Sequence, residues 1–297
     1  MKKKIFALSL ALILALSLAA CGGKDSGGSA PADTQTPADS ADSADSAPED
    51  SAPAGSAETV KLSVAASPTP HAEILKQCVD ILKEQGIELV VNEYADYVVP
   101  NTAVEDGDED ANYFQHVPYL DDFNAERGTH LVSVAGVHVE PMGLYAGKSD
   151  SLDAIPDGGK VALPNDATNE GRALLLLEAQ GIIKLTDSSN LAATPKDIAE
   201  NPKNLEFVEL EAANVPANLD EVDIAAINSN YALGAGLNPV EDALAIEASD
   251  SPYVNILVVK EGNENNEAVQ ALVKALQSDT VKDYINNTFG GAVVPAF

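Results

Sequence analysis

The sequence predicts an α/β protein with two lobes, and two observations support this prediction. Seven short runs rich in β-branched and apolar residues alternate with helical stretches, which is the order of elements in layered α/β folds. The runs span residues 61–66, 88–94, 131–139, 160–163, 205–209, 224–227 and 254–259. Roughly 240 residues follow position 58, which is more than one compact core usually serves. Two lobes with separate cores are therefore expected.

Residues 1–20 have the pattern of an export signal. Three lysines at 2–4 precede an apolar run at 5–18, and small residues stand directly before Cys21. The run is too short for a membrane-spanning helix. A cysteine in this position is typical of a bacterial lipobox, so we expect a lipidated Cys21 whose acyl chains hold the mature protein on the outer face of a membrane. The alternative is an ordinary signal peptide beside an incidental cysteine.

The segment that follows has the composition of a tether. Residues 22–58 contain no Leu, Ile, Val, Met or aromatic residue, and they repeat a Ser-Ala-Asp unit. Such a segment cannot bury enough apolar surface to offset the entropy of ordering. We expect residues 21–58 to be a lipidated cysteine followed by a disordered acidic tether.

The first helix is expected over residues 70–86. Its apolar residues at 74, 75, 78, 81 and 82 fall on one helical stripe. Cys78 lies on this stripe, which favours a small core residue over a reactive thiol. With Cys21 acylated, no second cysteine remains for an intramolecular disulfide.

Residues 110–120 are rich in aromatic rings, although the chain as a whole is poor in them. It has six Phe, eight Tyr and no Trp among 297 residues. Four ring-bearing residues fall within seven positions: Tyr113, Phe114, His116 and Tyr119. A helix, a glycine turn and a short strand are expected over 101–112, so that the ring cluster begins where the strand ends. Ligands of open α/β sheets gather at the carboxyl ends of strands. An aromatic cluster there suits an apolar ligand with a polar end.

A second candidate segment, residues 163–172, reads as a strand end, a turn rich in capping residues and the start of a helix. The start of a helix has free backbone N–H groups, and the Arg172 guanidinium follows one helical turn later. Together these groups make a site for a carboxylate. The alternative is an exposed arginine that pairs with Glu170 or Glu178. Together the two segments suggest a free amino acid with an apolar side chain.

Four amide and hydroxyl residues complete the candidate site. Asn228 and Asn230 lie where the run at 224–227 ends, and side chains two apart on an extended segment can face the same cleft. An amide oxygen of either can accept from a ligand ammonium group, and the spacing leaves open which one does. Asn165 and Thr168 either contact the ligand or, more economically, cap the Arg172 helix.

Several ordered blocks resemble the methionine-binding lipoproteins of ABC importers, the NlpA family of substrate-binding proteins. They include Phe-Gln-His-Val-Pro-Tyr at 114–119 and Pro-Asn-Asp-Ala-Thr-Asn-Glu-Gly-Arg at 164–172. Further blocks lie at 66–73, 96–101, 200–204, 227–228, 231–232 and 251–255, within a similarity that runs from about residue 60 to 297.

The resemblance implies a two-lobed periplasmic-binding-protein fold with a hinge and a ligand cleft between the lobes. It places the two chain crossings near 141–145 and 248–253, with helices at 264–288 returning to the first lobe. The expected domains are the signal peptide 1–20, the tether 21–58, lobe 1 at 59–143 and 252–297, and lobe 2 at 144–251.

The resemblance also implies residue roles. Four residues match positions that line the pocket for the methionine side chain: Tyr97, Phe114, His116 and Tyr119. For Tyr97 and Tyr119 the alternative is packing between the lobes. Arg172 matches the position that pairs with the ligand carboxylate, and an asparagine of the family corresponds to Asn228 or Asn230.

Composition and spacing argue against other functions. The net charge of −30 repels nucleic acids and anionic lipid surfaces. The four histidines lack a close metal-binding spacing, although His138 and Glu140 could point two donors to one face of a strand. Because the ring cluster favours an organic ligand, we predict neither a metal nor a cofactor. The chain has no Gly-x-Ser-x-Gly elbow and no metalloprotease His pair, so we predict no enzyme and no catalytic residue.

The sequence therefore predicts a lipid-anchored receptor on the extracellular or periplasmic side of the cell membrane. It would capture L-methionine and deliver it to an ABC importer permease with ATPase subunits. The alternatives are a receptor for D-methionine, a methionyl peptide, another amino acid or a metal, and a non-transport adhesin or sensor that binds a macromolecule through an exposed apolar patch. One methylene changes affinity by only about 1–3 kcal/mol, so the sequence leaves selectivity open.

Overall fold

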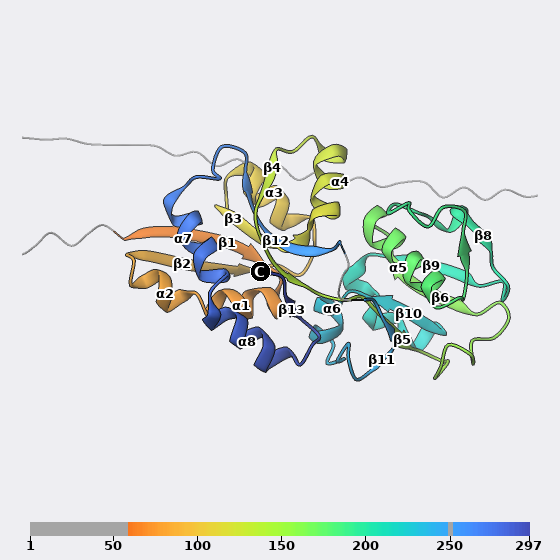
Figure 1. Ribbon diagram of the computed structural model, residues 1–297. Coiled ribbons are helices and arrows are strands. Elements are labelled where there is room, and N and C mark those ends of the chain that lie inside the picture. Colours follow the sequence, from red (N-terminus) through yellow and green to blue (C-terminus); the bar gives the residue numbers. More distant parts are fainter. Residues whose placement is uncertain (1–58, 249–251) are drawn as a thin grey trace, which may run out of the picture. The chain divides into compact units, whose positions relative to one another are not determined.

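The structure is a computed structural model that describes residues 59–248 and 252–297 (Figure 1). Two mixed sheets dominate it, each with its own hydrophobic core. The predicted α/β fold with two lobes is confirmed. The expected export signal, lipidated Cys21 and acidic tether lie outside the described residues.

The first sheet has six strands. Their spatial order is β13 (Val294–Pro295), β4 (Leu131–Val139), β12 (Val254–Lys260), β3 (Ala111–His116), β1 (Val60–Ala66) and β2 (Ile87–Glu93). Strand β1 pairs in parallel with β2 and β3, whereas β12 runs antiparallel between β3 and β4. Strand β3, which ends at His116, is therefore an inner strand with neighbours on both sides.

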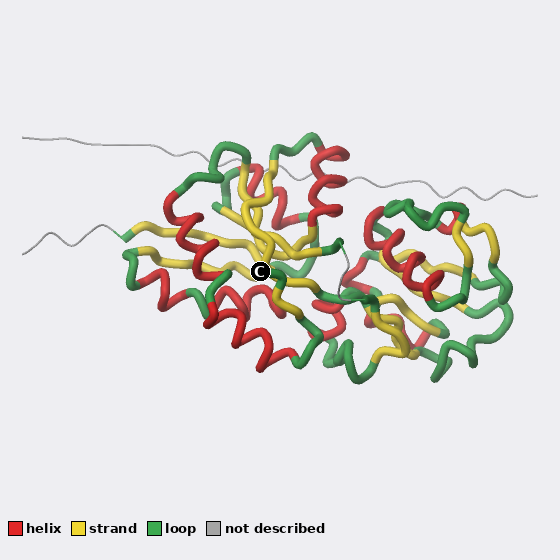
Figure 2. The backbone as a smooth tube through the Cα atoms, viewed as in Figure 1, coloured by secondary structure: helices red, strands yellow, loops and turns green. Residues whose placement is uncertain are grey.

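Helices cover the first sheet and close its core (Figure 2). Their bounds are η1 (Pro68–Ala72), α1 (Glu73–Lys76), α2 (Val79–Lys83), α3 (Val99–Asp106), α4 (Val117–Arg127), α7 (Glu267–Leu276) and α8 (Asp279–Phe289). Helices α7 and α8 supply buried residues to the same core as β1, which agrees with the expected return of residues 264–288 to this lobe. Helix α3 ends at Gly107, whose φ of 83° favours glycine.

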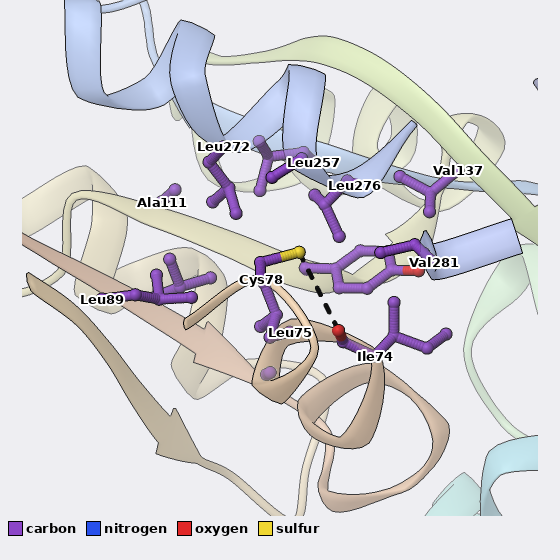
Figure 3. Packing of buried hydrophobic residues seen from close by; sticks show 14 of the residues in the cluster. Ile74, Leu75, Cys78, Leu89, Ala111, Val137, Leu257, Leu272, Leu276 and Val281 are labelled. Carbon is purple, nitrogen blue, oxygen red and sulfur yellow. Dashed lines mark hydrogen bonds between the residues drawn. The ribbon is translucent and has the colours of Figure 1, made fainter. Parts of the chain in front are cut away.

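The helix predicted over 70–86 forms as three short consecutive segments, η1, α1 and α2. Cys78, at the junction of α1 and α2, is fully buried among Leu75, Leu272 and Leu276 (Figure 3). Its Sγ lies 3.9 Å from the carbonyl oxygen of Ile74. Burial raises the pKa of the Cys78 thiol to about 12, so the group stays protonated. The prediction of a core cysteine is confirmed.

The second sheet has five strands in the order β11 (Ala243–Ile246), β5 (Gly143–Ala146), β10 (Ile224–Ile227), β6 (Lys160–Pro164) and β9 (Glu206–Leu210). Helix α5 (Ala167–Ala179) follows β6, and helix α6 (Ser229–Gly234) follows β10. Smaller elements are β7 (Lys184–Leu185), η2 (Pro195–Asp197), β8 (Ile198–Glu200), η3 (Ala212–Asn214) and η4 (Pro216–Glu221). Strands β6 and β10 are parallel, so helices α5 and α6 both start at the same edge of this sheet.

The chain passes from the first sheet to the second between β4 and β5, and it returns between β11 and β12. Both passages overlap the crossings expected near 141–145 and 248–253. Residues 249–251 lie outside the described part, and the exact lobe boundaries stay predictions. None of the helices within residues 59–248 and 252–297 combines the length and the apolar character that crossing a membrane requires.

All seven predicted strands form, each within one residue of its expected ends. One prediction beside them is wrong. The ring cluster does not begin after a strand that ends at 112, because β3 continues through His116 and includes Tyr113 and Phe114. Aromatic residues have high β propensity, and every residue of β3 is buried.

Candidate ligand-binding site

A cavity lies where the carboxyl end of β3 faces the start of α5 and α6. About 340 Å³ of space that protein atoms leave free lies here, part of it continuous with the solvent. Its lining consists of His71, Tyr97, Phe114, Gln115, His116, Tyr119, Glu140, Asn169, Arg172, Asn228, Ser229, Asn230 and Asn255. All seven residues that the sequence predicts as ligand contacts line this cavity. Their part in ligand binding stays a prediction.

Three aromatic rings form one side of the cavity. The ring centroid of Tyr97 lies 5.7 Å from that of Phe114 and 5.8 Å from that of Tyr119, and the last two are 6.1 Å apart. The Tyr119 hydroxyl donates to the Tyr97 carbonyl at 3.1 Å, which ties the rings to one another. The Tyr97 hydroxyl donates to Asn230 Oδ1 at 2.6 Å, across to the second sheet. The aromatic residues therefore line the cavity and also pack between the lobes.

His116 has a defined tautomer. It is the N-cap of α4, and its Nδ1 accepts from the Tyr119 backbone N–H at 3.2 Å. Its Nε2 must therefore carry the hydrogen, which it donates to Asn169 Oδ1 at 3.2 Å. Burial, with a smaller contribution from the Arg172 charge, lowers the pKa of His116 to about 3. The ring at the cavity wall is a neutral imidazole.

Asp166, not Asn165 or Thr168, caps helix α5. The Asp166 Oδ1 atom accepts from the backbone N–H of Asn169 at 3.0 Å and from its side-chain amide at 2.8 Å. The economical capping interpretation of Asn165 and Thr168 is therefore wrong, because a carboxylate reaches the free N–H group better. Asn169 Oδ1 also accepts from the Asn228 side chain at 2.8 Å, so the cap holds both His116 and Asn228 in place.

Arg172 is buried, with 3% of its side chain exposed, and pairs with neither Glu170 nor Glu178. Its Nε donates to Glu247 Oε2 at 3.0 Å, and its Nη2 donates to the same carboxylate and, at 2.7 Å, to the carbonyl of Glu140. The alternative of an exposed helix arginine is wrong, because Arg172 lies in a stretch of α5, residues 168–174, in which every residue is buried. These bonds use Nε and Nη2 and none uses Nη1.

The side-chain amides of Asn228 and Asn230 differ in whether their oxygen atoms already accept a hydrogen bond. Asn230 Oδ1 is engaged by the Tyr97 hydroxyl. Asn228 Oδ1 is buried and has no hydrogen-bond partner among the described residues. A buried amide oxygen without a partner is costly, so it is expected to receive a donor from a bound molecule. This geometry favours Asn228 over Asn230 as a ligand contact.

A buried cluster lies beside the cavity, made of His71, Tyr113, His138, Glu140 and Asn255. The Glu140 Oε1 atom lies 2.7 Å from His138 Nε2 and 3.2 Å from His71 Nε2. The other contacts are His71 Nε2 with Asn255 Oδ1 at 2.9 Å, and the Tyr113 hydroxyl with His138 Nδ1. His138 Nε2 therefore donates to the carboxylate, whereas His71 Nε2 donates to Asn255 Oδ1 and lies at ion-pair distance from Glu140. Burial raises the pKa of Glu140, while His71 and Arg172 act against that rise.

The same cluster bears on metal binding. Within residues 59–248 and 252–297, His71, His138 and Glu140 form the only group of three His, Cys, Asp or Glu residues whose ligand atoms could hold an ion, all within 4.8 Å of one another. His138 and Glu140 do share a face, as the strand pattern suggested, and His71 joins them from η1. However, hydrogen bonds already engage the three ligand atoms, which suits a network that positions Glu140. The absence of a metal stays a prediction.

Sequence reasoning did not select five of the lining residues: His71, Gln115, Asn169, Ser229 and Asn255. It left Glu140 without a role. His71 and Asn255 stand within blocks that carry the family resemblance, so that signal could have found them. Asn169 was hidden by its place in a capping turn, where an amide has an ordinary structural explanation.

We expect acidification from about pH 6.5 to pH 4.5 to lower the free energy of unfolding. The pKa values of His71, His116 and His138 lie near 4, 3 and 3 in the folded protein, because burial disfavours their charged forms. Unfolded histidine titrates near 6.5, so the unfolded chain binds more protons in this window and stability falls with pH. Each histidine contributes up to about 1.4 kcal/mol per pH unit, and the raised pKa of Glu140 opposes part of this loss.

Urea denaturation at pH 7.5, 6.5, 5.5 and 4.5 checks this expectation. The transition midpoint should change little between pH 7.5 and 6.5 and then decrease. A midpoint that stays constant down to pH 4.5 would show that the three imidazoles are not held neutral in the folded state.

The protein has two α/β lobes, which are joined by two chain passages. A small cavity with charged and aromatic walls lies between them. These features define a substrate-binding protein of the two-lobed class. The sequence profile of the NlpA lipoproteins matches residues 62–297. The chain belongs to the NlpA lipoprotein family.

Individual relatives agree with this assignment. Membrane lipoprotein TpN32 of Treponema pallidum (strain Nichols) is 45% identical over 240 residues, which cover 80% of this chain and 89% of the relative. D-methionine-binding lipoprotein MetQ of Salmonella typhi is 48% identical over 217 residues, which cover 72% of this chain and 80% of the relative. A nutrient-binding protein from Burkholderia cenocepacia, solved bound to methionine, superposes with a TM-score of 0.77 at 44% identity and covers 80% of this chain and all of the other.

Proposed function

We propose that this protein is the lipid-anchored substrate-binding component of an ABC importer and that it captures methionine. The observation that carries the proposal is the mixed lining of the cavity. It includes the three clustered rings of Tyr97, Phe114 and Tyr119. It also includes two charged residues in contact with each other, Arg172 and Glu140. A free amino acid with an apolar, unbranched side chain combines the same two kinds of group. The names of the MetQ relatives and the methionine-bound neighbour support this ligand.

The proposed pose follows from the hydrogen-bond capacity of the lining. The ligand carboxylate would face the Arg172 guanidinium, whose Nη1 takes part in none of the contacts to Glu247 and Glu140. The ammonium group would donate to Asn228 Oδ1, which has no partner among the described residues, and lie near the Glu140 carboxylate. Opposite charges at the two ends favour a zwitterion over an anion or a cation.

The thioether would lie among the three rings. Sulfur next to aromatic edges contributes about 0.3–1.5 kcal/mol per contact. The neutral His116 at the same wall adds polarizable surface without a charge that would need its own partner. A charged side chain would lose its hydration in this region without compensation, which disfavours basic and acidic amino acids.

Closure of the lobes would complete the site. Hydrogen bonds between the lobes join Tyr97 to Asn230, and His116 to Asn169. The hydroxyl of Tyr231 adds a third bond, to the Ala95 carbonyl at 3.0 Å. Because these bonds connect the aromatic side to α5 and α6, they would form when the lobes close over the ligand and break when they open. The closed form would be the one that the permease recognises.

The partners and location follow from the same proposal. A permease with ATPase subunits would receive the ligand, and the ATP chemistry would reside in those chains. The protein would act by binding, not by catalysis. It would be held on the extracellular or periplasmic side of the cell membrane through lipid on Cys21. Neither nucleic acid nor a cofactor has a role in this proposal.

The test begins with the ligand that the protein carries. Protein purified in detergent is denatured, the released small molecules are identified by mass spectrometry, and the refolded protein is titrated with L-methionine in a calorimeter. Release of methionine and stoichiometric rebinding are expected. A folded protein that neither releases nor binds methionine would reject it, and titration with D-methionine, methionyl peptides, other amino acids and Zn²⁺ would then separate the alternatives.

Replacing Phe114 by alanine is expected to weaken methionine binding and to relax discrimination. Phe114 is 3% exposed and forms the centre of the aromatic wall, so its loss leaves space beside the thioether. Calorimetry should show a loss of roughly 10-fold or more for methionine and a smaller loss for leucine. The matched control is Phe289→Ala, which removes a ring from the first core, outside the cavity lining, and should leave the methionine-to-leucine ratio unchanged. Equal losses for both ligands in Phe114→Ala would contradict its place in the side-chain pocket.

A further inference from the structure

An apolar groove lies directly behind the aromatic wall of the cavity. This outer groove holds about 900 Å³ of space open to solvent. Its walls come from both lobes and consist mainly of small or apolar residues, among them Pro68, Ala95, Pro216, Ala217 and Gly234. Asn230 lines both the cavity and the outer groove, so the two spaces are neighbours.

Two tyrosine rings in contact lie between the cavity and the outer groove. Tyr97 lines the cavity and Tyr231 lines the outer groove. Their ring centroids are 4.9 Å apart with an interplanar angle of 38°. The partition is therefore two rings thick, with one ring exposed to each space.

Hydroxyl groups fix both rings in this position. The Tyr97 hydroxyl donates to Asn230 Oδ1 at 2.6 Å, and the Tyr231 hydroxyl donates to the Ala95 carbonyl at 3.0 Å. Each bond crosses from one lobe to the other, so closing the lobes also closes the partition. Tyr97 cannot rotate away from the cavity while Tyr231 stands behind it.

We propose that Tyr231, by backing Tyr97, limits the length of the ligand side chain that the cavity accepts. This inference rests on the proposed function, in which the side chain points to the aromatic wall. The ligand class is then amino acids whose unbranched side chains end at the partition, about the length of methionine. Tyr231 is a specificity-determining residue that acts through Tyr97 and lines the outer groove, not the cavity.

The reason is steric. A side chain longer than that of methionine must push Tyr97 outward, and Tyr231 occupies the space into which Tyr97 would move. Removing the Tyr231 ring leaves Tyr97 as the only ring of the partition and frees the space behind it, so that Tyr97 can move outward and open the cavity toward the outer groove. The apolar walls of the outer groove can then cover the added methylenes, each of which raises affinity about fourfold when buried.

The experiment uses a series of ligands that differ only in the S-alkyl group. Calorimetric dissociation constants are measured for L-methionine and for its S-ethyl, S-propyl and S-butyl homologues. The proteins are the wild-type chain, Tyr231→Ala and the matched control Tyr231→Phe. The phenylalanine variant keeps the ring and removes only the hydroxyl bond to Ala95.

In the wild-type protein, affinity should fall at least 10-fold from the methyl to the butyl ligand. In Tyr231→Ala this fall should shrink to less than threefold or reverse. Tyr231→Phe should lose affinity by a similar factor for every ligand and keep the wild-type ratio. If Tyr231→Ala does not fold, Tyr231→Leu, which also removes the planar ring, is expected to shift the ratio in the same direction.

Equal methyl-to-butyl ratios in wild type and Tyr231→Ala would overturn this inference while leaving the proposed function intact. A wild-type protein whose affinity does not depend on the length of the S-alkyl group would also overturn this inference and leave the proposed function intact. A folded wild-type protein that binds no member of the series would overturn the proposed function, and this inference with it.

Discussion

Replacing Arg172 by alanine should lower the affinity for methionine by roughly 30-fold or more, corresponding to the 2–5 kcal/mol usual when one partner of a buried charge pair is removed. In the proposed pose, the ligand carboxylate would then be buried without a cation. The loss is increased by the protein itself. Glu247 now pairs with Arg172, so its carboxylate would lose its partner and remain behind the site as an uncompensated negative charge.

Two further variants separate this explanation from general damage. Arg172→Lys keeps a positive charge but loses the planar fork that contacts Glu247 and the Glu140 carbonyl, so we expect an intermediate loss. Arg127→Ala makes the same change of charge on the exposed surface of α4 and should leave methionine affinity unchanged. Calorimetry on the three proteins gives the comparison. Near-normal binding by Arg172→Ala, with folding confirmed by circular dichroism, would mean that the carboxylate lies elsewhere.

Local pattern predicted the strands because the forces that create them are local. The run at 131–139 became β4 without a change of bounds, since β-branched and small residues there fit a pleated, covered sheet. The end of β3 could not be placed in the same way. Whether Tyr113 to His116 continue a strand depends on pairing with β12, more than a hundred residues further along the chain. A short stretch of sequence around β3 carries no information about this distant pairing.

The site shows the same limit. Arg172, Phe114 and His116 stand out by residue type and turn context, and the structure brings them to one cavity. The partner of Arg172 could not be found, because Glu247 lies on the passage back to the first sheet and no spacing rule connects it to α5. Likewise, His71 meets Glu140 and Asn255 only through the packing of η1 against β4 and β12. Polar groups that are far apart in the sequence are assembled by tertiary structure alone.

Replacing Gly171 by alanine should destabilise the protein, although the same change inside an ordinary helix is stabilising by about 0.5–1 kcal/mol. Gly171 lies within α5, beside Arg172. A Cβ atom at Gly171 would lie 2.3 Å from the carbonyl oxygen of Leu191, 2.8 Å from its carbonyl carbon and 2.9 Å from the backbone nitrogen of Ala193. All three are backbone atoms, which cannot move aside by a change of rotamer. Overpacking of this kind costs about 1–3 kcal/mol and can cost more.

The matched control is Gly234→Ala at the end of α6, where the added Cβ would have only Thr69 Cγ2 near it, at 3.9 Å. Urea denaturation should show a lower midpoint for Gly171→Ala and an unchanged or slightly higher one for Gly234→Ala. Because α5 must shift away from residues 191–193 to accept the methyl group, Arg172 should shift with it, and methionine affinity should fall as well. An equally stable or more stable Gly171→Ala protein would show that α5 does not approach this loop closely. The placement of Arg172 would then need a different explanation, since the close contact at Gly171 is what seats the first half of the helix against its own lobe.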